Sequence, residues 1–194
     1  MRVLTDPGAY TSAQDEVRGI SIVLITHEHP DHLHIDSLKR VLANNPSAKV
    51  VTNRGVGDIL RCEAIPFQLL EHGQEAMVSG LRIEGHGESH AFIYQGVKEV
   101  VNTGYLLAGR FFYPGDAFYD LGKTVEVLAL PVAGPWMKIA EAIDYAKALA
   151  PRNCFPVHDG ILKHLGPVHA LPSKELSAVG ITFTVPELGV PFEV

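Results

Sequence analysis

Three histidines and an aspartate lie within six consecutive positions of this chain, in the order His-x-His-x-Asp-His. The preceding residues 21–26 form a short apolar run rich in β-branched side chains, which predicts a buried strand. Side chains two residues apart in an extended chain point the same way, so His27 and His29 can converge on one metal ion. Asp31 and His32 follow where the chain turns and are better placed for a second ion. Imidazole and carboxylate ligands suit zinc, iron and manganese.

The composition is that of a soluble globular protein, with 194 residues, 46% hydrophobic and 20% charged. This length suits a single domain spanning residues 1–194. We expect a cytoplasmic protein, because there is no signal-peptide pattern, no apolar run of the ~18 residues that cross a bilayer, and no metal-type spacing between Cys62 and Cys154. The net charge of −6 disfavours a nucleic-acid partner and leaves a small-molecule substrate as the expectation.

Apolar periodicity along the rest of the chain predicts a mixture of strands and helices. Strands are expected at 49–52, 67–70, 76–79, 81–84, 104–108, 110–113, 125–130, 153–157 and 181–185. Helices are expected at 37–44 after a cap at Asp36, at 56–62, at 136–149 and, more weakly, at 174–178. The pattern alone supports no more than a mixed α and β class.

Further metal-competent side chains follow three of the later strands. His86 and His90 come after the strand at 81–84, Asp116 ends a Pro-Gly-Asp segment, and His158 directly follows the strand at 153–157. Taken alone each signal is weak, since an Asp after Gly is most often a turn residue.

In this order along the chain, the motifs resemble those of the metallo-β-lactamase-fold hydrolases. Residues 130–136, Leu-Pro-Val-Ala-Gly-Pro-Trp, are a looser match to the branch related to ascorbate-6-phosphate lactonase. The resemblance extends from Asp6 to about Gly160. It implies a four-layer αββα sandwich, in which two mixed β-sheets are packed together with helices outside.

The resemblance also implies seven ligands for two divalent metal ions, with zinc ahead of manganese or iron. One ion would take His27, His29 and His90, the other Asp31, His32 and His158, and Asp116 would bridge them. We expect His90 rather than His86 as the third histidine, because its spacing from the turn at Gly80 resembles the lactonase-like branch. His86, Trp136 and Lys138 are then candidates for substrate binding.

The implied activity is that of a metal-dependent hydrolase in which a dinuclear metal-activated hydroxide attacks a small-molecule ester, lactone or phosphoester. Asp31 and Asp116 would orient and neutralise the metals, and Glu88 is a candidate for holding a histidine tautomer. A nuclease or phosphodiesterase of the same fold, a mononuclear iron dioxygenase and a non-catalytic binding module are the alternatives. Glu in place of His29 would be expected in a flavodiiron protein, so that class is disfavoured.

One departure from the family concerns the start of the chain. Family members usually open with a β-hairpin that ends in Asp-Pro-Gly, whereas Asp6-Pro7-Gly8 here follows Met1 almost at once. We therefore expect the N-terminal hairpin to be missing and a strand near residues 1–5 to lie at an exposed sheet edge. Such an edge could pair with another copy, so a homo-oligomer is an expected partner state.

Overall fold

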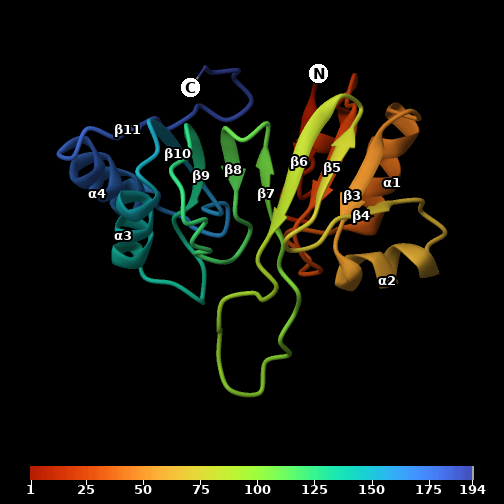
Figure 1. Ribbon diagram of the computed structural model, residues 1–194, viewed down its shortest axis with the longest axis horizontal. Helices are drawn as coiled ribbons and strands as arrows, with labels where there is room; N and C mark the ends of the chain where they lie inside the picture. The colour runs from red at the N-terminus through yellow and green to blue at the C-terminus, as the bar shows by residue number, and fades with distance from the viewer. Residues whose placement is uncertain (194) are drawn as a thin grey trace.

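A computed structural model describes residues 1–193 and arranges the strands in two facing sheets (Figure 1). One sheet is parallel, in the order β1 (Val3–Thr5), β2 (Ile22–Ile25), β3 (Lys49–Thr52) and β4 (Gln68–Leu69). The other is mixed, in the order β11 (Thr182–Phe183), β10 (Asn153–Val157), β9 (Val127–Pro131), β8 (Phe111–Tyr113), β7 (Gly104–Leu107), β6 (Leu81–His86) and β5 (Glu75–Val78).

Helices cover the outer face of each sheet (Figure 1). The four-stranded sheet carries α1 (Ile35–Asn44) and α2 (Arg54–Cys62), and the seven-stranded sheet carries α3 (Ile139–Leu149) and α4 (Gly166–Ser177). A short 3-10 helix, Ala13–Glu16, follows β1. The prediction of a four-layer sandwich is therefore confirmed, although the sheet formed by the first strands is wholly parallel rather than mixed.

Strand β2 shows why the fold needs apolar residues on both sides of its central strands. Val23 and Ile25 pack with side chains of the covering helices, whereas Ile22 and Leu24 pack with Tyr105 and its neighbours from the facing sheet. All four β2 residues are fully buried. A strand covered on both faces reads as a continuous apolar run rather than an alternating one, as this one does.

Several strands end at the same edge of the sandwich. β8, β9 and β10 are parallel, and β6 runs in the same direction because both β6 and β8 are antiparallel to β7. The loop after β2 meets this edge, since the Thr103 amide next to β7 donates to the Thr26 carbonyl at 3.0 Å. The long connection between β6 and β7, hereafter the 87–103 loop, extends beyond the edge (Figure 1).

The predicted helices and strands differ from the observed ones only at their ends, apart from α4, and the 3-10 helix Ala13–Glu16 was not predicted. Helix α1 begins at Ile35 after His34, so Asp36 lies in its first turn instead of capping it. Helix α3 begins three residues later than predicted. Helix α4 begins eight residues before the predicted 174–178 and contains Pro172.

Strand β1 occupies the edge of the four-stranded sheet, as expected. It pairs with β2 on one side, and no strand of residues 1–193 pairs with its other side. Association of two copies through this edge stays a prediction. Within residues 1–193, no helix combines the length and apolar character needed to traverse a lipid bilayer.

Candidate metal centre

The loop after β2 is folded into a tight turn that presents its polar side chains on one side. The amides of His32 and Leu33 both donate to the His29 carbonyl, at 2.9 and 2.8 Å. Gly8 packs against this turn so closely that a Cβ at its position would lie 1.7 Å from the Asp31 carbonyl oxygen. A residue without a side chain is therefore required at position 8.

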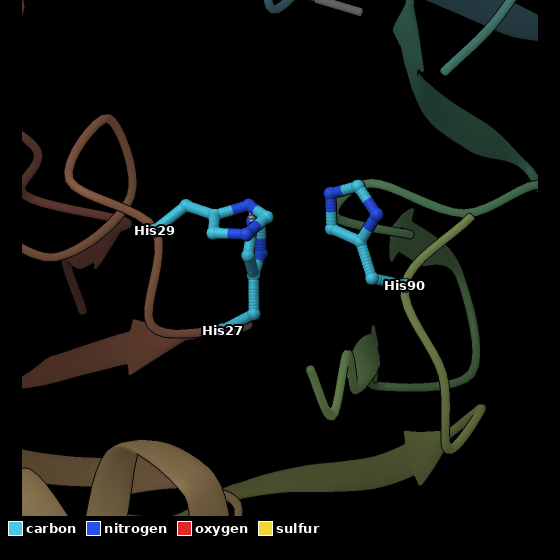
Figure 2. A group of neighbouring side chains, drawn as sticks. All are labelled: His27, His29 and His90. Atoms are coloured by element: carbon cyan, nitrogen blue, oxygen red, sulfur yellow. Dashed lines mark hydrogen bonds between the residues drawn. The ribbon is translucent and has the colours of Figure 1, made fainter. Parts of the chain in front are cut away.

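Seven side chains from four separate segments converge at the sheet edge. His27, His29 and His90 form one group, Asp31, His32 and His158 a second, and His27, His32 and Asp116 a third, with the potential ligand atoms of each group within 4.8 Å of one another. Figure 2 shows His27 and His29 facing His90, which approaches from the opposite side on the 87–103 loop. Their role as metal ligands is a proposal that this geometry supports.

The spacing of ring nitrogens fits a shared cation. His27 Nε2 lies 3.1 Å from His29 Nδ1, and His32 Nε2 lies 3.1 Å from His158 Nε2. Two ligands each ~2.1 Å from a tetrahedral ion would be about 3.4 Å apart. The observed separations are close to this value, so a small outward shift of each ring would admit an ion.

The outward nitrogens of the later histidines are held by backbone carbonyls. His90 Nδ1 donates to the Ala91 carbonyl at 2.6 Å, and His158 Nδ1 donates to the Ala133 carbonyl at 2.8 Å. Each hydrogen bond fixes the tautomer that leaves the Nε2 lone pair directed into the group. His158 also has a φ of 64°, a left-handed conformation that non-glycine residues adopt at a cost and that is common at functional sites.

Asp6 holds two of the earlier histidines. Its Oδ2 accepts hydrogen bonds from His32 Nδ1 at 2.7 Å, Thr26 Oγ1 at 2.8 Å and Tyr113 Oη at 2.9 Å. Since the Thr26 hydroxyl donates to Asp6, it is free to accept from His27 Nδ1, 3.0 Å away. Asp6 therefore orients His32 directly and His27 through Thr26.

Asp116 is set between the two groups of histidines by its own neighbours. Gly115 has a φ of +65°, and a Cβ there would lie 2.3 Å from Asn102 Oδ1, so glycine is needed to enter this turn. Asn102 Oδ1 accepts from the Asp116 amide at 3.0 Å, and Trp136 Nε1 donates to Asp116 Oδ2 at 2.7 Å.

The carboxylate of Asp116 faces histidines on both sides. Oδ2 lies 3.3 Å from His90 Nε2 and 3.0 Å from His158 Nε2, and Oδ1 lies 3.2 Å from His32 Nε2. Oδ1 is buried and accepts no hydrogen bond of acceptable geometry. A buried carboxylate oxygen without a donor carries a substantial free-energy cost, which a bound cation would offset.

Burial and charge act differently on the histidines. Burial lowers the pKa of both His27 and His29, which keeps these rings neutral and able to ligate. Burial also disfavours protonation of His32 and His158, but the carboxylates facing them outweigh it and raise each pKa to about 10. Despite burial, the facing histidines hold the pKa of Asp116 well below its usual range. A divalent cation can replace the protons that these rings would otherwise hold.

Not every predicted site residue lies in this group. A cavity of about 590 Å³ opens over the cluster, and Trp136 is part of its wall. Lys138 is exposed, precedes α3 and lies 3.7 Å from Glu141, and His86 packs edge-on against Phe112. Neither lines the cavity.

The carboxylate that orients a histidine was also predicted at the wrong residue. Glu88 is exposed, and among residues 1–193 no hydrogen bond joins its carboxylate to a histidine; His90 Nδ1, for example, is bonded to a backbone carbonyl. Asp6 fills that role for His32 instead. The Asp-Pro-Gly segment was visible in the sequence, but nothing local indicates that its carboxylate reaches a residue 26 positions away.

Comparisons with known proteins show the family. A model described as "Beta-lactamase superfamily domain" matches residues 1–158, so the chain belongs to this superfamily. Protein Rv0786c of Mycobacterium tuberculosis is 36% identical over 166 residues, which make up 83% of this chain and 77% of that protein. A UPF0173 metal-dependent hydrolase of Methanocaldococcus jannaschii is 25% identical, over 92% of this chain and 86% of its own length.

A solved structure shows the same fold. A crystallised protein of Parabacteroides distasonis superposes on this chain with a TM-score of 0.75, at 23% identity, over 96% of this chain and 84% of the other. At that identity the likeness supports the sandwich architecture alone.

The close approach of Gly8 predicts a large effect of one added methyl group. Gly8→Ala should lower the free energy of unfolding by ~1–3 kcal/mol, because the new Cβ must displace the turn at Asp31. Gly166→Ala is the matched control, since a Cβ there meets nothing within 4 Å. Chemical denaturation of both variants provides the measurement, and equal stabilities would contradict the proposed packing.

The contacts of Asp6 predict an effect on metal affinity. Asp6→Asn replaces one acceptor oxygen by an amide donor, so His32 loses its anionic partner and divalent-metal affinity should fall about 10–100-fold. Competition with a chromophoric chelator measures this, and Asp36→Asn, exposed in the first turn of α1, is the control. Unchanged affinity in a folded Asp6→Asn protein would show that the hydrogen bond does not tune the site.

Proposed function

We propose that this member of the β-lactamase superfamily is a metal-dependent hydrolase that cleaves a small-molecule ester or lactone at a two-metal centre. The observation that carries the proposal is the convergence of seven histidine and aspartate side chains at one sheet edge. The Nδ1 atoms of His32, His90 and His158 are held there by hydrogen bonds to the Asp6 carboxylate or to backbone carbonyls. The name of the Methanocaldococcus jannaschii relative, a metal-dependent hydrolase, supports the same class.

The donor set fits two divalent ions. One would be held by His27, His29 and His90, a three-imidazole set that suits zinc and leaves a position open. For the other, His158 and Asp31 are neighbours, since the Asp31 carboxylate lies 3.2 Å from His158 Nε2, and His32 completes the set. Asp116 faces both groups and would help to hold both ions. Zinc is proposed ahead of manganese and iron because nitrogen ligands predominate.

When bound, such ions supply hydroxide from water at neutral pH and stabilise negative charge on the substrate. The protein contributes by fixing the orientation of the proposed metal ligands. Asp6 fixes His32, backbone carbonyls fix His90 and His158, and Trp136 restrains one oxygen of Asp116. These four side chains are thereby held in one orientation before a metal ion binds, which lowers the entropic cost of forming the site.

An ester or lactone is favoured over a phosphodiester by the charge of the cavity. No lysine or arginine lines it in the part of the chain that the structure describes. A phosphodiesterase would place an anion there with the metal ions as its only positive charge, whereas the carbonyl of an ester brings no charge until the reaction begins. Nuclease activity is therefore the less favoured alternative.

Metal removal tests the proposed class. Hydrolysis of simple phenyl esters or lactones should be abolished by exhaustive chelation and restored by zinc or manganese, because the bound ions are proposed to supply the attacking hydroxide. Metal analysis of the protein as purified, before chelation, distinguishes the alternatives. Two zinc or manganese ions per chain support the hydrolase, one iron supports an oxygenase, and none supports a binding module. Turnover that survives chelation would overturn the mechanism.

Asp116 should be essential to the second ion. An amide cannot join two cations as a carboxylate does, so Asp116→Asn should lower the metal content below two and kcat/KM by about 100-fold or more. Asp120→Asn, an exposed residue of the same loop, is the control and should change neither. Metal content and turnover are measured on the same preparations. Two variants with equal values would mean that Asp116 is an ordinary turn residue.

A further inference from the structure

The cavity over the metal centre has a polar floor and apolar walls. Its lining comprises Tyr10, His29, Pro30, Asp31, His90, Ile93, Asp116, Pro135, Trp136, His158 and Ile161. Of these, the histidines and aspartates all belong to the proposed ligand set and form the floor. The remaining six are proline, aliphatic or aromatic residues, so a molecule reaching the floor must lie against apolar side chains.

The walls come from separate segments that the structure holds in place. Tyr10 follows Ala9, whose amide donates to the Pro30 carbonyl at 2.8 Å and keeps this segment beside the metal-binding turn. The Ala91 amide donates to the Asp116 carbonyl at 2.9 Å, which anchors the 87–103 loop two residues before Ile93. The walls are thus tied to the same residues that form the floor.

Two wall residues are more exposed than apolar side chains of a closed core would be. Tyr10 is 63% exposed and Ile161 is 46% exposed. Apolar side chains gathered around the mouth of a cavity gain free energy when an apolar group covers them. Tyr10 and Ile161 line the cavity together with the proposed metal ligands, so a substrate bound there would cover them.

The walls offer nothing to a charged substituent. In the portion of the chain described, the ionisable side chains of the lining are Tyr10 and the proposed metal ligands, and no ammonium or guanidinium group is among them. An anionic group on the part of a substrate that contacts the walls would lose hydration without gaining an ammonium or guanidinium partner, which is costly. The lining of the cavity therefore disfavours the binding of substrates that carry such a charge.

We propose that the substrate is an uncharged ester or lactone bearing an apolar alkyl or aryl group, which packs against Tyr10, Ile93 and Ile161. This rests on the proposed hydrolase function for the position of the reacting carbonyl over the floor. The preference of the walls for an apolar, uncharged group is separable from catalysis and can be measured by binding alone.

The single tryptophan of the chain provides the reporter. Trp136 lines the cavity, so its fluorescence responds directly to occupancy. The zinc-loaded protein is titrated with N-butyl-, N-hexyl- and N-octylacetamide, which present a carbonyl and an apolar chain but resist hydrolysis. It is also titrated with N-(5-carboxypentyl)acetamide, which matches the hexyl compound in length and carries a charge at its far end.

The expected result is a half-saturating concentration that falls about three- to fourfold per added methylene while the chain remains against the walls. The carboxylated compound should bind at least ~10-fold more weakly than the hexyl compound. Ile161→Ser should weaken hexyl binding about 3- to 10-fold. Val185→Ser is the control and should have no effect, since Val185 is 47% exposed, as Ile161 is at 46%, but lies outside the cavity lining.

Failure of this inference and failure of the proposed function give different results. Binding that is independent of chain length, tighter binding of the carboxylated compound, or equal behaviour of the two serine variants would overturn the inference, even if esters are hydrolysed. Chain-length dependence in a protein that hydrolyses no ester would support the apolar cavity and overturn the hydrolase. A complete absence of fluorescence change with every compound also counts against the inference.

Discussion

The hydrogen bonds accepted by the Asp6 carboxylate are the interaction on which the rest of the site depends. Asp6 follows β1, yet it binds Thr26 and His32 from the loop after β2 and Tyr113 from the end of β8. These partners belong to both sheets, so one buried carboxylate joins the two halves of the sandwich at the edge where the side chains gather. A charged acceptor with several donors is strong enough to hold that junction.

Around this junction the fold provides rigidity that the site requires. Three apolar clusters fill the spaces between the four layers. The strands that lead into the proposed metal ligands are anchored in these clusters. The proposed metal ligands themselves come after strand ends, where the backbone can depart from regular geometry. The left-handed conformation of His158 is one such departure, and the surrounding hydrogen bonds stabilise it against its local cost.

The sequence predicted the parts of the structure that are local and left out those that depend on distant contacts. The histidine-rich turn was predictable because a buried strand and the spacing of its ligands lie within twelve consecutive residues. The contact of Trp136 with Asp116 spans 20 positions and that of Tyr113 with Asp6 spans 107, so no pattern in the sequence indicates either. Lys138 was expected near the substrate because the sequence predicts a helix that begins at Trp136. The chain instead turns at Trp136, and α3 begins only at Ile139.

The seven converging side chains are proposed to hold two ions, with Asp116 between them. The most direct test is a crystal structure of the zinc-loaded protein with anomalous diffraction recorded on both sides of the zinc absorption edge. We expect two anomalous peaks ~3.5–4 Å apart, one among His27, His29 and His90 and the other beside Asp31, His32 and His158, with the Asp116 carboxylate between them. A single peak, or zinc bound elsewhere with these side chains unchanged, would contradict this proposal.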